Sequence, residues 1–294
     1  MSILLAGCGD LGIAVGRRFE ARGEQVVGVR RRTDLLPASF EKQSVDLRRE
    51  RPTVADDTSL VVVSLTAGER TAAAYEESYL GGLGHVLDAV GASAAAPRIL
   101  LVSSTAVYGT RDGSWVDETT PAEPTSPTGR VLRRTEELLA ERAGDAPILR
   151  LGGIYGPGRE RLIDQVRSGT ATIPAHPQHT NRIHRDDAAA AIVHLATRDA
   201  PPPLVVGVDD EPAELGDVLR FLAQELGLPE PRHEPVRPSE GATGPESTPA
   251  RNEGPGDKRL RNTLLRSTGF EFAYPTFREG YRALLAGSPA AGVR

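Results

Sequence analysis

The chain has 294 residues, enough to bury a full doubly wound core and to leave room for a smaller second lobe. Its 35 basic and 40 acidic residues leave a net charge of -5, which argues against nucleic acid or an anionic membrane as the main partner. The single cysteine, Cys8, excludes an intramolecular disulfide and a cysteine-based metal site.

Targeting segments are not visible in the sequence. The apolar run at the start is too short to span a membrane and lacks the charged leader of a signal peptide. We therefore expect a cytoplasmic protein with no membrane partner. The histidines show no metal-ligand spacing with carboxylates, so no metal is expected. The expected partner is a small-molecule substrate, and monomer and homodimer both stay open.

The first thirty residues predict a strand, a glycine turn, a helix and a second strand. Ile3 to Ala6 is a short apolar run of the kind that a buried parallel strand needs. It ends at Gly7, Gly9 and Gly12, which form a Gly-x-Gly-x-x-Gly turn. In such a turn the glycines permit a sharp bend, close approach of a pyrophosphate and tight packing of the next helix. The order predicts a dinucleotide site at a helix N-terminus.

The second predicted strand, Gln25 to Val29, is followed by the arginine run Arg30 to Arg32. A site for NAD usually has a carboxylate here, which hydrogen-bonds the ribose 2′-hydroxyl. A carboxylate would repel a 2′-phosphate, whereas a guanidinium can hold one with two parallel charge-assisted bonds. The run therefore predicts NADP in preference to NAD. The alternative is a solvated loop, because the sequence has only two lysines, Lys42 and Lys258, and arginine is its default cation.

Strands and helices are predicted to alternate through the middle of the chain. This alternation predicts an α/β fold of the Rossmann-like, doubly wound type, with a ligand across the carboxyl ends of the parallel strands. Asp46 is expected to reach an adenine edge from a short strand. The predicted elements are a strand over Val45 to Leu47, a strand over Leu60 to Val63 that ends at Ser64, Leu65 and Thr66, a helix over Tyr75 to Val90, and a strand over Arg98 to Val102.

The segment from Ser103 to Gly109 reads Ser-Ser-Thr-Ala-Val-Tyr-Gly. Together with the glycine turn, it resembles the extended short-chain dehydrogenase/reductase family, which includes nucleotide-sugar epimerases and dehydratases. The resemblance implies that Ser104, four residues before the Tyr-Gly, hydrogen-bonds the reacting oxygen, with Thr105 beside it. Tyr108 is a further candidate catalytic residue. The alternative is that hydroxyls at a strand end only cap the next turn.

Other segments extend this resemblance over almost the whole chain. Residues 148–158 resemble the family's sixth strand and nicotinamide-side loop, residues 181–187 its Asn-x-Ile-His-Val-x-Asp segment, and residues 257–280 an atypical, YeeZ-like branch. Arg182 and His184 are candidate substrate-binding residues, with a solvated turn as the alternative for the arginine. The residues expected to contact the cofactor are Gly7, Gly9, Asp10, Leu11, Gly12, Arg30, Arg31, Asp46, Ser64, Leu65, Thr66, Gly153, Ile154 and Tyr155.

The resemblance also implies a Tyr-x-x-x-Lys pair on the helix that starts at Pro127. This spacing puts both side chains on one helix face, where the ammonium lowers the pKa of the tyrosine for proton exchange. Aligned on the proline, Thr128 takes the tyrosine place and Leu132 the lysine place, and neither can do this chemistry. Tyr108, Tyr155 and His184 are candidate substitutes, for each of which packing is the alternative.

These observations predict an NADP-dependent oxidoreductase or epimerase-like enzyme that acts on a small polar carbonyl or a sugar-nucleotide-like substrate. The alternative is an NADP-binding sensor or scaffold that uses the fold without turnover. Residues 235–256 are rich in Pro, Gly, Ser and Glu, which predicts a mobile loop, with a lid over substrate as the alternative. The expected lobes are a Rossmann domain of residues 1–160 and 179–200, and a smaller α/β substrate lobe of residues 161–178 and 201–294, in which a strand is expected over Leu204 to Val208 and a helix over Ala213 to Leu226.

Overall fold

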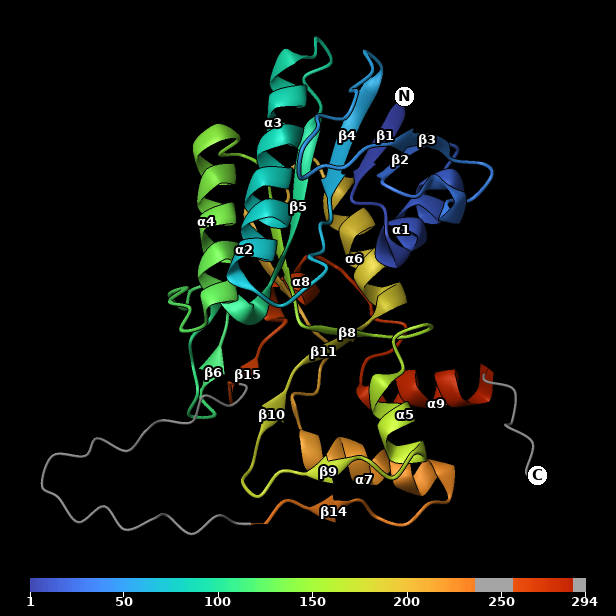
Figure 1. Cartoon of the computed structure of the whole chain (residues 1–294), viewed down its shortest axis with the longest axis vertical. Coiled ribbons are helices and arrows are strands. Elements are labelled where there is room, and N and C mark those ends of the chain that lie inside the picture. The colour runs from blue at the N-terminus through green and yellow to red at the C-terminus, as the bar shows by residue number, and fades with distance from the viewer. Residues whose placement is uncertain (236–255, 288–294) are drawn as a thin grey trace, which may run out of the picture.

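A computed structural model of the chain describes residues 1–235 and 256–287. Within them, a parallel sheet of seven strands lies between two layers of helices (Figure 1). The strands of this sheet are β1 (Ser2–Ala6), β2 (Gln25–Arg30), β3 (Glu41–Ser44), β4 (Thr58–Val63), β5 (Arg98–Ser104), β7 (Ile148–Leu151) and β12 (Leu204–Gly207). Their order across the sheet is β12-β7-β5-β4-β1-β2-β3. The predicted α/β, Rossmann-like doubly wound fold is confirmed.

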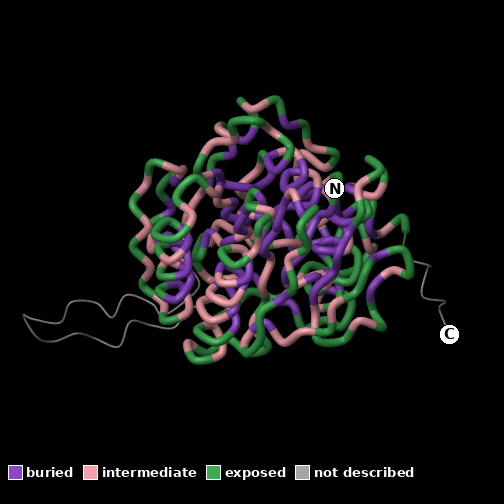
Figure 2. Tube along the Cα trace, turned by 90° about the horizontal axis from the view of Figure 1, so that it is seen from above, coloured by how far each residue is buried: buried purple, intermediate pink, exposed green. Residues whose placement is uncertain are grey.

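The central strands are apolar on both faces because helices cover both faces. Along β1, Ile3 and Leu5 belong to one hydrophobic cluster, whereas Leu4 and Ala6 belong to a second. This alternation is what a strand's two-residue period requires. Figure 2 shows that buried residues fill the middle of the molecule. The helices that contribute to the first cluster are α1 (Asp10–Glu20), α6 (Arg185–Ala196) and, through Leu265, α8 (Thr263–Ser267). Those that contribute to the second are α3 (Gly82–Ala92) and α4 (Pro127–Arg142).

The predicted strand over Val45 to Leu47 is wrong. The edge strand β3 lies just before this segment, and pairs in parallel with β2 from Val27↔Glu41 to Arg30↔Ser44. Its four residues are polar and mostly exposed, so it lacks the apolar pattern by which the other strands were found. A polar edge strand is stable here because its ladder to β2 needs only backbone groups.

The placement of Leu204 to Val208 in the smaller lobe is also wrong. Leu204–Gly207 pairs in parallel with Ile148–Leu151 and forms the outermost strand of the central sheet. The apolar run itself was correctly predicted as a strand. Its assignment failed because a short buried strand has the same sequence pattern in either lobe, and only its hydrogen-bonding neighbour distinguishes them.

The helix predicted over Tyr75 to Val90 is longer and less regular than expected. Helical turns run from Ala72 to Ala92 and include a stretch of π-helix in their middle. Stretches of π-helix are rare, and many of those that occur lie at functional sites. The three parts are α2 (Ala72–Tyr75), η2 (Glu76–Gly81) and α3.

Beyond the carboxyl ends of the sheet strands, a smaller group of helices packs around its own hydrophobic cluster (Figure 1). It consists of α5 (Arg161–Arg167), α7 (Leu215–Leu226) and α9 (Phe277–Gly287). The helix predicted over Ala213 to Leu226 is confirmed from Leu215 onward in α7, where Val218, Leu219 and Leu222 are buried, whereas its first two residues form a short strand. The remaining elements are η1 (Thr33–Leu35), η3 (Thr105–Val107), β6 (Trp115–Val116), β8 (Gly153–Tyr155), β9 (Thr172–Ile173), β10 (His179–Thr180), β11 (Arg182–His184), β13 (Ala213–Glu214), β14 (Arg232–His233) and β15 (Arg259–Leu260).

Two further expectations from the sequence concern the loop over 235–256 and helices that could span a membrane. All but the two end residues of the loop predicted over 235–256 lie outside the described residues. Among the described residues, no helix combines the length and apolar character needed to cross a membrane.

Candidate functional site

The glycine turn joins β1 to α1 at the carboxyl edge of the sheet. Gly7 has a φ of 82°, and a Cβ there would lie 2.5 Å from the carbonyl oxygen of Ser64, so no other residue fits. At Gly9, by contrast, a Cβ would meet nothing nearer than 4.0 Å. The helix that follows has no side-chain cap, so its first N–H groups are available to an anion. The turn therefore offers what a phosphate needs, an open approach and free backbone donors.

A cavity of about 650 Å³ opens beside this turn, at the ends of β2 and β4. Several residues predicted to contact the cofactor are in its wall, whereas Asp10, Leu11, Gly12 and Ser64 adjoin it without lining it. The wall consists of Gly7, Gly9, Val29, Arg30, Arg31, Arg32, Val45, Asp46, Leu47, Arg48, Leu65, Thr66, Gly68 and Ser78.

Four guanidinium groups and one carboxylate give the cavity wall a net positive charge. Arg30 donates from Nη1 to the Cys8 carbonyl at 3.3 Å, so it also supports the glycine turn. The carboxylate, Asp46, accepts from Nε and Nη2 of Arg48 at 2.9 and 2.6 Å. This ion pair holds the pKa of Asp46 at about 2. Arg48 was missed by the sequence analysis, although the spacing Asp-x-Arg in a turn was the available signal.

Arg159, from the loop after β8, reaches the glycine turn. Its Nε and Nη2 donate to the carboxylate of Asp10 at 2.6 and 2.7 Å, and this contact lowers the pKa of Asp10. Asp10 would otherwise present a bare negative charge beside the open face of Gly9. The pair leaves the turn acceptable to a phosphate. Sequence alone gave no sign that Arg159 would lie here, because the contact depends on how the loop folds over the sheet.

The candidate catalytic hydroxyls follow the end of β5. The Oγ of Ser104 caps η3 by accepting from the backbone N–H of Ala106 at 3.2 Å, as the structural alternative predicted. Capping occupies one oxygen lone pair, and the O–H of the serine stays able to donate. Thr105 is buried. The two possible roles of Ser104 are therefore compatible.

Tyr108 is 2% exposed, and the described residues supply no hydrogen bond to its hydroxyl. The guanidinium of Arg150 lies over its ring at 4.8 Å from the centroid, and burial raises the pKa of the phenol. A sealed phenol has no route to exchange a proton with a substrate. The surroundings of Tyr108 are those of a packing residue.

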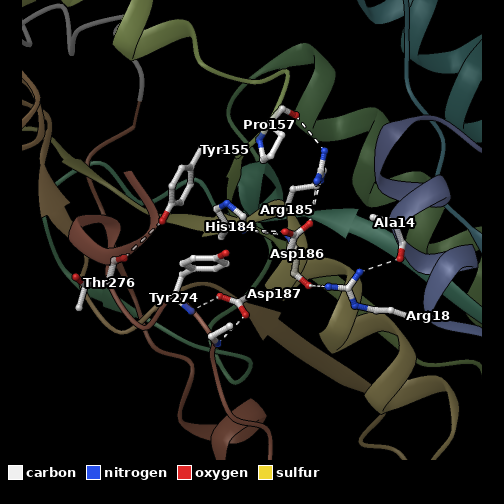
Figure 3. Close-up of polar contacts among 11 residues, drawn as sticks. Ala14, Arg18, Tyr155, Pro157, His184, Arg185, Asp186, Asp187, Tyr274 and Thr276 are labelled. Atoms are coloured by element: carbon white, nitrogen blue, oxygen red, sulfur yellow. Dashed lines mark hydrogen bonds and ion pairs between the residues drawn. The ribbon is translucent and has the colours of Figure 1, made fainter. Parts of the chain in front are cut away.

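The predicted substrate residues lie on β11 and point into the protein. His184 is 2% exposed and caps α6, where its Nδ1 accepts from the backbone N–H of Asp186 at 3.2 Å. Its ring lies between Tyr274, at 3.9 Å between centroids, and Tyr155, at 5.4 Å (Figure 3). Burial lowers the pKa of His184 to about 4. Arg182 is 4% exposed, and neither side chain lines the cavity beside the glycine turn.

The three predicted cofactor residues on β8 are also away from that wall. Gly153, Ile154 and Tyr155 pair in parallel with β11. Tyr155 is buried, and its hydroxyl donates to the carbonyl of Thr276 at 3.5 Å. A Cβ on Gly280 of α9 would lie 1.9 Å from that hydroxyl oxygen. In this structure Tyr155 therefore joins the two-stranded sheet of β8 and β11 to α9 of the smaller lobe.

Comparison with known proteins places these features in a family. A model of the NAD dependent epimerase/dehydratase family matches residues 3–207. The protein YeeZ of Escherichia coli K12 is 34% identical over 205 residues, which cover 66% of this chain and 72% of YeeZ. A 3-diazoavenalumate denitrifying reductase from a Streptomyces species is 31% identical over 216 residues, 68% of each chain.

Solved structures agree with this result. A protein from Methylobacillus flagellatus, assigned to the NAD-dependent epimerases/dehydratases, is 35% identical with a TM-score of 0.75 over 97% of both chains. A human epimerase family protein solved with NADPH is 17% identical and has a TM-score of 0.77, covering 98% of this chain and 100% of its own. At this lower identity the likeness concerns the fold alone.

Proposed function

The chain belongs to the NAD-dependent epimerase/dehydratase family of NAD(P)-binding enzymes, and from this premise we propose that it is an NADP-dependent oxidoreductase or epimerase-like enzyme. Its substrate is a small polar carbonyl compound or a sugar nucleotide. The observation that carries the proposal is the wall of four arginines, Arg30, Arg31, Arg32 and Arg48, in the cavity beside the glycine turn.

The position of these arginines favours a phosphate on the adenosine ribose. The last residue of β2 is Arg30, where an NAD site would have a carboxylate that binds the 2′-hydroxyl. The carboxylate that does line the cavity, Asp46, is already neutralised by Arg48. A dianionic 2′-phosphate is therefore attracted by the remaining guanidinium groups, and each bidentate contact adds specificity.

The residues after β5 supply the chemistry toward the substrate. When bound, a reduced nicotinamide supplies a hydride to the carbonyl carbon. The O–H of Ser104 donates to the carbonyl oxygen, and the η3 cap fixes the direction of this hydroxyl. Thr105 supports the same segment. We propose that residues 161–178, 208–235 and 256–287 of the smaller lobe, together with β11, hold the rest of the substrate over the carboxyl ends of the strands.

Isothermal titration with NADPH and NADH tests the cofactor preference. We expect NADPH to bind more tightly, and Arg31→Ala to weaken NADPH by about 10- to 150-fold, the value of one hydrogen bond to a charged group, with little effect on NADH. The side chain of Arg31 is exposed, so its loss leaves the fold intact. Arg22→Ala, an exposed arginine that does not line the cavity, is the matched control. Equal affinity for both cofactors, unchanged by Arg31→Ala, would disprove the preference.

A cofactor-binding sensor or scaffold is the second candidate. The observation that favours it is Leu132, in the family's lysine place, which is 3% exposed and fully part of the core. Turnover separates the candidates. If the protein binds NADPH, oxidises none of it with any carbonyl compound offered, and changes its association with another protein on binding, the sensor is correct.

A further inference from the structure

The π-helical stretch η2 contains a tyrosine, Tyr79, close to the cavity beside the glycine turn. No sequence motif marks this tyrosine. Tyr79 lies in this stretch, and the residue before it, Ser78, lines the cavity beside the glycine turn. A π-turn changes which side chains share a helix face, because it accommodates an extra residue. The π-helical stretch therefore reaches the cavity wall at Ser78, and Tyr79 is its neighbour in the chain.

Packing locates the Tyr79 ring more closely. It lies against the hydrophobic cluster that includes Val107 of η3 and Leu132 of α4. Val107 is three residues after Ser104, and Leu132 occupies the place of the family's lysine. The ring of Tyr75 stacks on Tyr79 with 4.9 Å between centroids. The phenol thus lies near the segment of the candidate hydroxyls and the helix face from which the usual acid is missing.

A positive charge also acts on this phenol. The guanidinium of Arg159, which is bonded to Asp10 at the glycine turn, interacts electrostatically with Tyr79. Burial has the larger effect and raises the pKa of Tyr79 to about 12, so the hydroxyl is protonated near neutral pH. Among the hydrogen bonds within residues 1–235 and 256–287, none involves that hydroxyl, so its O–H can donate to a ligand.

We propose that Tyr79 is the general acid of this site and that Arg159 stabilises the phenolate it leaves. The assignment rests on the proposed oxidoreductase function. As the hydride forms the new C–H bond, the O–H bond of Tyr79 breaks and its proton forms the new O–H bond of the alcohol. Water then returns a proton to the phenolate. The usual tyrosine function is thereby moved from α4 to η2.

Steady-state reduction of glyceraldehyde and 4-nitrobenzaldehyde with NADPH, measured beside NADPH titration, tests the assignment. We expect Tyr79→Phe to lower kcat by about 100- to 10,000-fold, the contribution of general acid catalysis, with an unchanged Kd for NADPH. Tyr75→Phe, the stacked neighbour in the same helix, is the matched control and is expected to keep the wild-type kcat. Residual turnover by Tyr79→Phe should fall as pH rises, because its proton must come from solvent.

The outcomes separate a failure of the Tyr79 assignment from a failure of the proposed oxidoreductase function. If Tyr79→Phe binds NADPH and reduces the aldehydes at the wild-type rate, Tyr79 is not the acid, while the proposed oxidoreductase function stands. If the wild-type protein reduces neither aldehyde although it binds NADPH, the oxidoreductase function fails and the assignment fails with it. Equal loss in Tyr75→Phe and Tyr79→Phe, with the wild-type pH profile in both, would mean a packing role for the tyrosine pair.

Discussion

The ion pair of Asp10 and Arg159 joins two residues 149 positions apart in the chain. It lies at the glycine turn, where the proposed function places a pyrophosphate. Both side chains are partly exposed, so the pair adds little to folding stability. Apart from the stabilisation of the phenolate proposed for Arg159, we expect the pair to act on cofactor binding. We expect Arg159→Ala to weaken NADPH and NADH equally, by about tenfold or more, because a bare Asp10 carboxylate would face the phosphates.

Titration of the double variant Asp10→Asn/Arg159→Ala supplies the control. It removes the negative charge as well and should recover much of the affinity that Arg159→Ala loses. This pattern differs from the one expected at Arg31, where only NADPH is affected. A loss confined to NADPH in Arg159→Ala would contradict this role.

Because the ring of His184 is buried, we expect the free energy of unfolding to depend on pH. The pKa of His184 is about 4 in the folded protein, against 6.5 for an unperturbed histidine, because the ring is buried. The unfolded chain therefore binds a proton that the folded chain refuses as the pH falls from 6.5 through 4. The free energy of unfolding should be fully retained above pH 6.5 and decrease by up to about 3 kcal/mol toward pH 4.

Urea denaturation at several pH values measures this slope. His184→Asn is the informative variant, since asparagine can still cap α6 but does not titrate. The variant should lose the part of the slope between pH 6.5 and 4. An unchanged slope in His184→Asn would assign the pH dependence to other groups.

At the residue scale, the sequence predicted those residues whose role depends on neighbours close in the chain. Gly7 and Gly9 were identifiable because their turn depends on backbone conformation and on residues close in sequence. Arg159 and Tyr79 were not, because the first acts through a distant loop and the second through a π-turn that has no sequence signature. Ser104 was found through the resemblance of its segment, while its capping contact needed the structure.

Among the elements, α4 is fixed to the sheet by a buried ion pair. Nε and Nη2 of Arg150 on β7 donate to Glu136 at 2.9 and 2.6 Å, and Ser103 on β5 donates to the same carboxylate at 2.6 Å. The ionic side chains are 4% and 1% exposed. Removing one partner leaves an uncompensated buried charge. We expect Glu136→Ala to lower the free energy of unfolding by about 3 to 5 kcal/mol.

Urea denaturation of three variants tests this role. Glu136→Ala and Arg150→Ala should each be strongly destabilised, whereas Glu136→Leu/Arg150→Met, which replaces the pair by apolar groups, should recover most of the loss. Glu137→Ala, an exposed neighbour on α4, is the control and should change little. If the double variant were as unstable as the sum of the single ones, the two charges would not be coupled.

The elements also explain where pattern reading failed. Buried strands such as β1 and β4 were found because consecutive apolar residues are rare outside a covered sheet. The polar edge strand β3 carries no such pattern, and its existence depends on the backbone of β2. For β12 the pattern was present, but its partner β7 lies some fifty residues earlier, and pairing over that distance cannot be read from one segment.

At the scale of the whole molecule, contact between Tyr155 and Gly280 joins α9 of the smaller lobe to the two-stranded sheet of β8 and β11. A Cβ at Gly280 would lie 1.9 Å from the Tyr155 hydroxyl oxygen and 2.7 Å from Cζ, so Gly280→Ala must push α9 away from β8. We expect a cost of about 1 to 3 kcal/mol from overpacking, partly relieved in Tyr155→Phe/Gly280→Ala because the nearest atom is removed. Thermal unfolding measures both. NADPH binding should be unchanged, since the cavity proposed for the cofactor lies beside the glycine turn of the large lobe, while turnover should fall. Equal loss of NADPH binding would mean that the two lobes form one cofactor site, against the division proposed above.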